Sequence, residues 1–128
     1  MRLLIDTHVA LWWESNHPRL SKAIVDLIRD EADAVFVSRA SLWEIAIKVS
    51  IGRLRLDIAT FADNLEKHGF EWLDLKNSHV IAVAGLPEFQ DHRDPFDRLL
   101  VAQSRVEPLL LVTADRMLER YGATVRVI

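Results

Sequence analysis

Four acidic residues stand where predicted elements of the chain begin or end, which is where a fold can bring carboxylates together. Two of them follow apolar runs of strand length, and the other two lie in the early turns of predicted helices: Asp6, Asp115, Glu44 and Asp97. Carboxylate oxygens are the ligands that Mg²⁺ and Mn²⁺ prefer, and the chain has no cysteine or paired-histidine pattern that would select zinc. Carboxylate-held Mg²⁺ most often serves phosphoryl or phosphodiester transfer. The residue types therefore indicate metal-dependent phosphate chemistry, provided that the fold gathers these acids.

The segment at residues 92–98 predicts the start of a helix. Asp94 is a preferred N-cap residue, and Pro95 is tolerated at the first helical position, where its missing N–H costs nothing. Asp97 then falls at the third helical position, where the helix dipole favours a carboxylate by about 0.3–1 kcal/mol. An isolated Asp-Pro-x-Asp is more often a helix cap than part of an active site. We therefore expect Asp94 to have a structural role, fixing the turn that aims Asp97.

Short apolar runs alternate with helical patterns along the chain. The predicted strands lie at residues 3–5, 34–37, 71–75, 109–112 and 125–128. The predicted helices begin after the N-cap Thr7, after Ser21, after Ser38, at Ile58, at Asn77, after Asp94 and at Arg116. Apolar strands that alternate with helices predict an α/β fold, in which helices cover both faces of a central parallel sheet of about five strands.

A parallel sheet explains how the four acids would meet. Ligands of such sheets bind at the carboxyl ends of the strands, where the strand order reverses. Asp6 follows the strand at 3–5 and Asp115 follows the strand at 109–112. Glu44 lies near the start of the helix that leaves the strand at 34–37, and Asp97 lies in the first turn of the helix that leads into the strand at 109–112. All four are thus predicted at one edge, where their repulsion and loss of solvation call for a cation.

Composition limits the class of protein. The 128 residues suit a single domain, 1–128, and 50% hydrophobic and 27% charged residues are ordinary for a soluble globular protein. The absence of cysteine suits a reducing cytoplasm, and the short apolar start predicts neither a signal peptide nor a membrane span. With a net charge of −3, any nucleic-acid contact must come from a local basic patch.

Four blocks of the sequence resemble the PIN-domain ribonucleases, and more closely the VapC-type toxins of bacterial and archaeal toxin–antitoxin pairs. The blocks are Leu-Leu-Ile-Asp-Thr-His at 3–8, Ser-Leu-Trp-Glu-Ile-Ala-Ile-Lys at 41–48, Asp-Pro-Phe-Asp-Arg at 94–98 and Thr-Ala-Asp at 113–115. The resemblance covers nearly the whole chain. It implies a compact three-layer α/β/α sandwich, Mg²⁺- or Mn²⁺-dependent endoribonuclease activity, a homodimer, and inhibition by a small cognate antitoxin protein.

The resemblance also implies roles for individual residues. The family's acidic quartet matches Asp6, Glu44, Asp97 and Asp115, and its supporting hydroxyls match Thr7 and Thr113. Asp6 and Asp97 would be the principal metal ligands, with Glu44 and Asp115 completing the shell directly or through water. The bound metal would activate a water for attack on an RNA phosphodiester.

Several neighbouring residues have two readings. Lys48 and Arg98 could contact RNA phosphates or only balance the acids, and for Glu44 alone a surface pair with Lys48 would be the ordinary interpretation. His8 and His92 could act as general bases, but the quartet explains the chemistry without them, so neither enters the predicted catalytic set. A group of apolar residues exceeds the needs of a small monomer and could pack in the core, in a homodimer or against an antitoxin: Trp12, Trp13, Trp43, Val49, Ile51 and Leu54.

Three other functions compete with this interpretation. A metal-dependent phosphatase of the haloacid-dehalogenase type would have Asp-x-Asp after the first strand, where this chain has Asp6-Thr7-His8. A non-catalytic RNA-binding module on the same scaffold is disfavoured by the intact acids. A DNA nuclease stays open, because the metal chemistry does not distinguish the sugar.

Overall fold

The computed structural model describes residues 1–128. The strands are β1 (Arg2–Ile5), β2 (Ala34–Ser38), β3 (Glu71–Leu73), β4 (Leu110–Thr113) and β5 (Val125–Val127). The α-helices are α1 (Thr7–Ser15), α2 (Lys22–Asp26), α3 (Arg39–Ser50), α4 (Ile58–Lys67), α5 (Asn77–Val83) and α6 (Pro95–Val106). A π-helical segment, η1 (Leu27–Glu31), continues α2, and a 3₁₀ helix, η2 (Arg116–Tyr121), follows β4.

The five strands form one parallel sheet in the order β3-β2-β1-β4-β5. β1 lies at the centre, where Ile5 pairs with Val37 of β2 on one side and with Val112 of β4 on the other. The chain fills one half of the sheet before it crosses to the other, so the strand order reverses between β1 and β4. The predicted α/β class with a parallel sheet of about five strands is confirmed.

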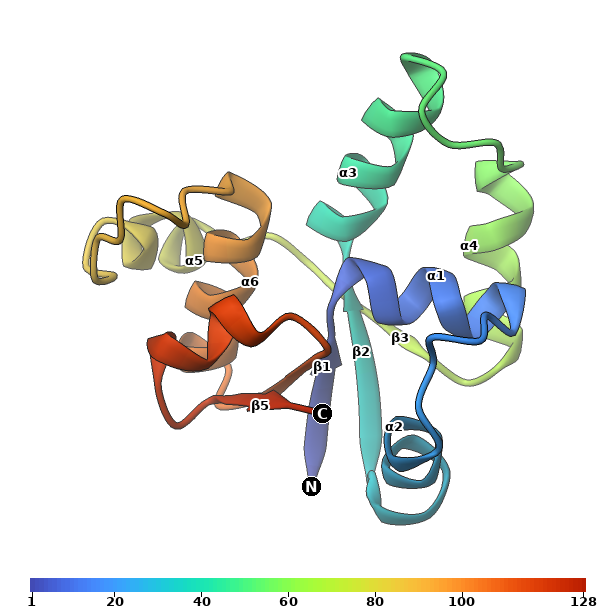
Figure 1. Cartoon of the computed structure of the whole chain (residues 1–128), viewed down its shortest axis with the longest axis horizontal. Helices are drawn as coiled ribbons and strands as arrows, with labels where there is room; N and C mark the ends of the chain where they lie inside the picture. The colour runs from blue at the N-terminus through green and yellow to red at the C-terminus, as the bar shows by residue number, and fades with distance from the viewer.

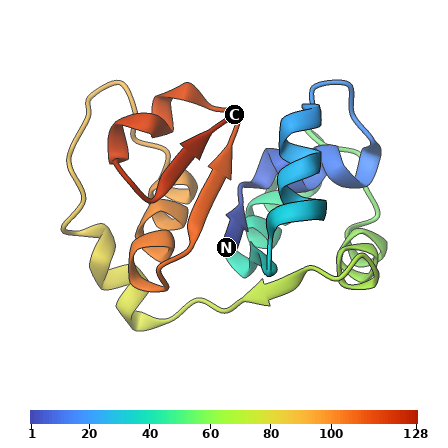
Figure 2. The ribbon, with the colours of Figure 1, turned by 90° about the horizontal axis from the view of Figure 1, so that it is seen from below.

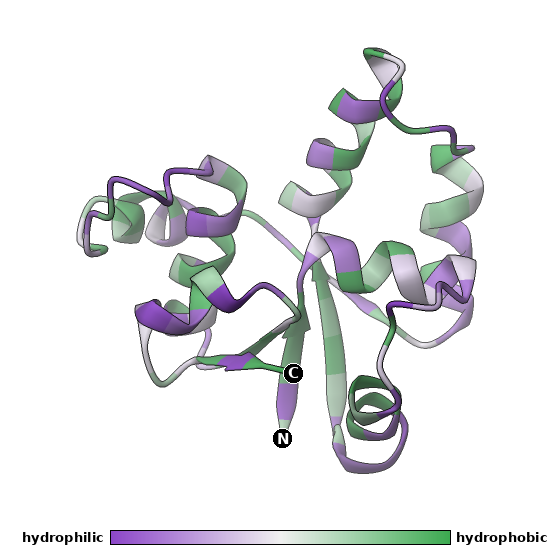
Figure 3. Ribbon diagram, viewed as in Figure 1, coloured by the Kyte–Doolittle hydropathy of each residue, from purple (hydrophilic) through white to green (hydrophobic).

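Helices cover both faces of the sheet and give three layers (Figures 1 and 2). Alternate residues of β1 point to opposite faces: Leu3 and Ile5 belong to a core cluster with residues of α1, α2, α3 and α4, whereas Leu4 belongs to a second cluster with residues of α6 and η2. β1 and β2 are mainly hydrophobic and the covering helices are mixed in character (Figure 3). The apolar runs in the sequence are therefore strands buried on both faces.

The helix starts follow the predicted capping chemistry, with one exception. Ser38 caps α3, and Asp94 caps α6 with Pro95 at the first helical position. The expectation that Thr7 caps the first helix is wrong: the cap is Asp6, whose carboxylate accepts the N–H of Val9, and Thr7 is the first helical residue. An aspartate caps at least as well as a threonine, and the helix starts as soon as β1 ends.

One strand differs from its predicted bounds by more than one residue, and the last helix differs in type. β3 ends at Leu73 and not at residue 75, because its neighbour β2 ends at Ser38, which pairs with Leu73 and leaves the next residues without a strand beside them. The last predicted helix is the 3₁₀ helix η2. None of the helices combines the length and the apolar character needed to cross a membrane.

Candidate active site

Asp6 and Asp115 lie at the carboxyl ends of β1 and β4, where the strand order reverses. Asp6 is only 4% exposed, and its Oδ1 accepts the backbone N–H of Val9 at 2.9 Å. Its Oδ2 accepts a hydrogen bond from the hydroxyl of Thr113, the last residue of β4. Asp115 donates its backbone N–H to the same hydroxyl at 3.0 Å, and its carboxylate caps η2 by accepting the N–H of Met117 at 2.9 Å. Thr113 therefore ties the two strand ends together.

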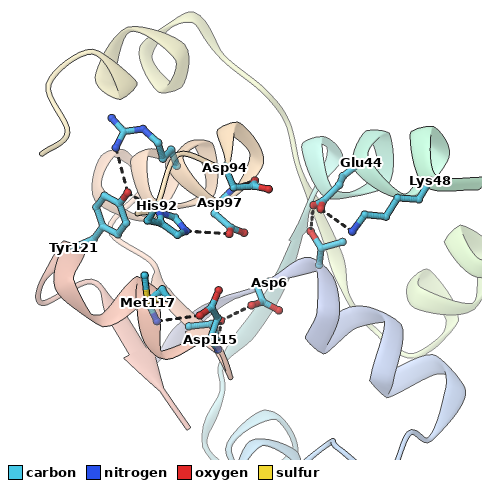
Figure 4. Close-up of polar contacts among 12 residues, drawn as sticks. Asp6, Glu44, Lys48, His92, Asp94, Asp97, Asp115, Met117 and Tyr121 are labelled. Atoms are coloured by element: carbon cyan, nitrogen blue, oxygen red, sulfur yellow. Dashed lines mark hydrogen bonds and ion pairs between the residues drawn. The ribbon is translucent and has the colours of Figure 1, made fainter. Parts of the chain in front are cut away.

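Asp97 reaches the same place from the first turn of α6. The carboxylate of Asp94 accepts the backbone N–H of Asp97 at 2.9 Å, so the N-cap fixes the turn that carries Asp97, as the sequence predicted. Figure 4 shows the carboxylates of Asp6, Asp97 and Asp115 turned toward a common space. These three residues are called the aspartate cluster below.

Burial and mutual repulsion raise the pKa values of two members of this cluster. Burial raises the pKa of Asp6, and the charge of Asp115 adds to this, while the hydrogen bonds from Thr113 and Val9 oppose it. The pKa of Asp97 is raised to about 6, mainly by burial and then by the charge of Asp94, with a further contribution from Asp6. Neither carboxylate forms an ion pair with a lysine or arginine, and the opposing charges that lower their pKa values come from the histidines His8 and His92.

The donor atoms in the aspartate cluster fit a small divalent cation. One oxygen each from Asp97 and Asp115 and one ring nitrogen of His92 lie within 4.8 Å of one another. Two carboxylates so arranged, with Asp6 close enough to raise the pKa of Asp97 by its charge, provide the oxygen ligands that Mg²⁺ and Mn²⁺ favour. A bound cation would also remove the repulsion that burial intensifies.

Glu44, the fourth acid of the predicted quartet, is placed differently. Its Oε1 accepts a hydrogen bond from the Thr7 hydroxyl at 2.8 Å, and its Oε2 pairs with Lys48 at 3.2 Å. The Thr7 hydroxyl also lies 2.9 Å from that of Ser41. In Figure 4 Glu44 and Lys48 stand apart from the aspartate cluster. The structure therefore gathers three of the four acids closely and leaves Glu44 with a cation of its own.

Two predicted RNA-contacting residues already have protein partners. Lys48 forms the i,i+4 pair with Glu44 that the helical spacing allowed. Arg98 is 7% exposed, and its guanidinium donates to the Pro87 carbonyl at 2.8 Å, to the Tyr121 hydroxyl at 3.1 Å and to Glu88 at 3.1 Å. These contacts use three of the five N–H donors of the guanidinium, and a contact of Arg98 with RNA stays a prediction.

His92, which the predicted catalytic set left out, touches the aspartate cluster. It is 7% exposed, its Nε2 lies 3.2 Å from Asp97 Oδ2, and its Nδ1 lies 2.8 Å from the Tyr121 hydroxyl. The only sequence signal was its position five residues before Asp97. Its partner Tyr121 lies 29 residues further along the chain, so no local pattern could reveal the contact.

One cavity adjoins the aspartate cluster, and a second cavity lies next to it. The smaller, of about 230 Å³, is lined by Asp6, Asp115 and Arg19, together with His8 and Trp12. The larger, of about 550 Å³, lies between α1, α4 and the segment that precedes α4, and it shares His8 and Trp12 with the smaller one. Lys48, Arg53 and Arg55 also line the larger cavity. A path with basic residues along it therefore leads away from the acids.

Comparisons with known proteins agree with this architecture. The family model described as "PIN domain" matches residues 3–123. The chain is 30% identical over 128 residues to Ribonuclease VapC22 of Mycobacterium tuberculosis (strain ATCC 25618 / H37Rv), across 93% of this chain and 91% of that protein.

Solved structures share the fold at lower identity. VapBC2 from Rickettsia felis, bound to a DNA fragment from its promoter, has a TM-score of 0.72 at 16% identity and covers 100% of this chain and 98% of its own. DNA-bound VapBC from Salmonella typhimurium has a TM-score of 0.66 at 18% identity, covering 100% and 97%. A toxin–antitoxin complex from Klebsiella pneumoniae has a TM-score of 0.68 at 12% identity, covering 98% and 96%. With its parallel sheet, its matched family model and its VapC relative, the chain belongs to the PIN domain family.

Proposed function

We propose that the protein is a divalent-metal-dependent endoribonuclease that hydrolyses RNA phosphodiesters, and that it is the toxin of a toxin–antitoxin pair. The observation that carries the proposal is the aspartate cluster: Asp6, Asp97 and Asp115 face one another without a lysine or arginine partner, at the strand ends where the sheet order reverses. The family, and a relative named as a ribonuclease, support RNA as the substrate.

The residues of this site would divide the work as follows. Asp6 and Asp97 would be the principal ligands of Mg²⁺ or Mn²⁺, with Asp115 beside them, and Thr113 would hold Asp6 in place by its hydrogen bond. When bound, the cation supplies an activated water and offsets the charge that develops on the phosphate. Glu44, which Thr7 orients, would act at the edge of the site through water.

Basic residues mark the path that an RNA strand would take. Arg19, Arg53 and Arg55 line the two cavities and form no ion pair within the chain. Trp12, which borders both cavities, offers an aromatic surface for a base. The strand would therefore run from the aspartate cluster past Trp12 toward Arg53 and Arg55.

Two protein partners complete the proposal. The solved structures that share this fold include a toxin–antitoxin complex, which supports a small cognate antitoxin as an inhibitor. A homodimer is supported by apolar side chains at the surface: Trp43 and Ile51 are each 59% exposed and Ile47 is 37% exposed. The other members of the apolar group named from the sequence are half-buried, and most pack against a core cluster. The ring of Trp13, for example, packs edge-on against that of Phe70 with the ring centroids 5.3 Å apart.

The test is a cleavage time course on bacterial RNA with Mg²⁺, with the ends of the products mapped by sequencing. Wild type is compared with Asp6→Asn and with an EDTA control, and Mn²⁺ is tried in parallel. We expect discrete cuts that require both Asp6 and the metal. Absence of cleavage by folded, antitoxin-free protein with either metal would favour a non-catalytic RNA-binding module or another phosphoryl substrate. A matched DNA strand in the same assay separates RNA from DNA cleavage.

A further inference from the structure

His92 has a hydrogen-bond partner at each ring nitrogen, and the neighbours of these partners determine which group donates and which accepts. Nδ1 lies 2.8 Å from the Tyr121 hydroxyl and Nε2 lies 3.2 Å from Asp97 Oδ2. A neutral imidazole carries its proton on one nitrogen only, and the partner of the other nitrogen decides which. The partners of Tyr121 therefore determine what His92 offers to Asp97.

Arg98 settles the direction at the tyrosine. Its Nη1 donates to the Tyr121 hydroxyl at 3.1 Å, and a guanidinium can only donate. The phenol oxygen thus accepts from Arg98, and its own proton has one acceptor in reach, Nδ1 of His92. Tyr121 is 2% exposed, so a proton pointed elsewhere would lie buried without an acceptor. Nδ1 is then the acceptor, and Nε2 carries the proton of His92.

We propose that Arg98, Tyr121 and His92 form a directed chain of hydrogen bonds that keeps Nδ1 of His92 as an acceptor and the ring proton on Nε2, so that His92 orients the Asp97 carboxylate and is not itself a metal ligand. Metal binding by His92 is the alternative, because one of its ring nitrogens lies within 4.8 Å of donor atoms of Asp97 and Asp115. A protonated Nε2 has no lone pair for a metal, so the ligand set stays all-oxygen, the kind that Mg²⁺ prefers. This proposal rests on the proposed metal site.

Arg98, at the far end of the hydrogen-bond chain, is held by further contacts, and this fixes the orientation of the His92 ring. Arg98 also donates to the Pro87 carbonyl at 2.8 Å and to Glu88 at 3.1 Å. The Tyr121 ring packs edge-on against His92 with centroids 5.4 Å apart. Asp97 is thereby held at its backbone by Asp94 and at Oδ2 by His92, and Oδ1 is left for a cation.

The first test reads the tautomer directly, without RNA or metal. Protein with ¹⁵N-labelled histidine is examined by long-range ¹H–¹⁵N NMR, and the His92 signals are assigned by their loss in His92→Gln. We expect the ring proton on Nε2 and not on Nδ1, and a loss of that preference in Tyr121→Phe. A proton on Nδ1 in the wild type would overturn the proposal.

The second test asks whether His92 binds metal. Mn²⁺ is bound to the ¹⁵N-histidine protein, and the electron paramagnetic signal is examined for coupling between Mn²⁺ and ¹⁵N. We expect no coupling of the size that a directly bound nitrogen gives. A coupling that is present in the wild type and lost in His92→Gln would contradict the proposal. His68→Gln is the matched control, because His68 is exposed and pairs with Glu14 at 2.6 Å, away from the aspartate cluster.

The third test separates positioning from simple folding. The amide nitrogen of glutamine can replace the Nε2–H donor, so His92→Gln should keep Mn²⁺ affinity within a few-fold, whereas His92→Leu should lower it by about 10- to 100-fold, as loss of a group that orients a ligand does. Equal losses in both variants, with wild-type melting temperatures, would count against positioning. If His92→Leu does not fold, the proposal is tested by the position of the ring proton in the wild type and by the Mn²⁺ affinity of His92→Gln. If wild type binds Mn²⁺ but cuts no RNA, the proposed function fails, while the NMR and Mn²⁺-binding measurements still test the hydrogen-bond chain.

Discussion

Asp97 and Glu44 are both acids of the predicted quartet, yet the protein treats them in opposite ways. Glu44 has a cation of its own, Lys48 at 3.2 Å, and a hydroxyl donor, Thr7 at 2.8 Å. Asp97 faces other carboxylates, and its pKa is raised to about 6. A carboxylate that already has a lysine partner gains little from a metal, whereas a crowded one gains the removal of repulsion. Unbalanced charge, more than the mere presence of an acid, therefore distinguishes the metal site.

The largest expected effect is on Asp97 itself. Asp97→Asn keeps the shape of the side chain and removes the charge, so Mg²⁺-dependent cleavage should fall by more than about 100-fold, beyond the usual loss from an outer-shell change. Initial cleavage rates at saturating Mg²⁺ measure this. Asp63→Asn, on the exposed side of α4, is the matched control and should cleave like wild type. Wild-type rates in Asp97→Asn would remove Asp97 from the site.

The next largest effect is on the stability of the metal-free protein, where Asp97→Asn is expected to stabilise the fold although it abolishes activity. The folded-state pKa of Asp97 is about 6 against an ordinary value of 3.8, so its ionisation opposes folding: the stability it contributes is full below about pH 4 and is lost as pH rises through about 6. In EDTA at neutral pH, Asp97→Asn should therefore be more stable than wild type by about 1–3 kcal/mol, and the difference should vanish toward pH 4. Urea unfolding across this range measures it, and a variant less stable at neutral pH would contradict the pKa.

Glu44 should matter less than Asp97. If Glu44 acts at the edge of the site through water, Glu44→Gln should reduce cleavage by about 10-fold and Mn²⁺ affinity by less than that. Cleavage rates and metal titrations of Glu44→Gln beside Asp97→Asn make the comparison, and equal losses in the two variants would mean that Glu44 is a ligand of the same rank.

The smallest effect concerns the hydroxyl that orients Glu44. Thr7→Val removes the hydrogen bonds to Glu44 and Ser41 at a residue that is 4% exposed, so the free energy of unfolding should fall by about 1–2 kcal/mol. Lys48 still holds Glu44, so metal affinity should change by no more than a few-fold. Thermal unfolding and Mn²⁺ titration measure both, and a loss of metal binding as large as that of Asp97→Asn would place Glu44 and Thr7 inside the metal site.

The sequence predicted those features of the fold that depend on local patterns. Buried strands appear as continuous apolar runs, and Asp94-Pro95 carries a capping signal that the structure confirms. The convergence of Asp6, Asp97 and Asp115 also followed, because the carboxyl ends of parallel strands share an edge. Adjacent capping residues such as Asp6 and Thr7 compete for one role, and there the local rule chose the wrong one.

What the sequence could not predict depends on partners far along the chain. His92 is positioned by its hydrogen bond with Tyr121. Arg98 donates to Tyr121, Pro87 and Glu88 and not to the acids of the quartet. Helical spacing alone could not tell whether Glu44 would meet the other acids or remain with Lys48. These outcomes depend on tertiary packing of the second core cluster and of α3, which no spacing within one element encodes.

The most direct test of the account is a calorimetric titration of Mn²⁺ into metal-free wild type, Asp97→Asn and Glu44→Gln near neutral pH. The account predicts a cation held by the aspartate cluster: wild type binds Mn²⁺, Asp97→Asn loses binding by more than about 100-fold, and Glu44→Gln stays within about 10-fold of wild type. Undiminished binding in Asp97→Asn, or binding abolished by Glu44→Gln alone, would show that the metal lies elsewhere.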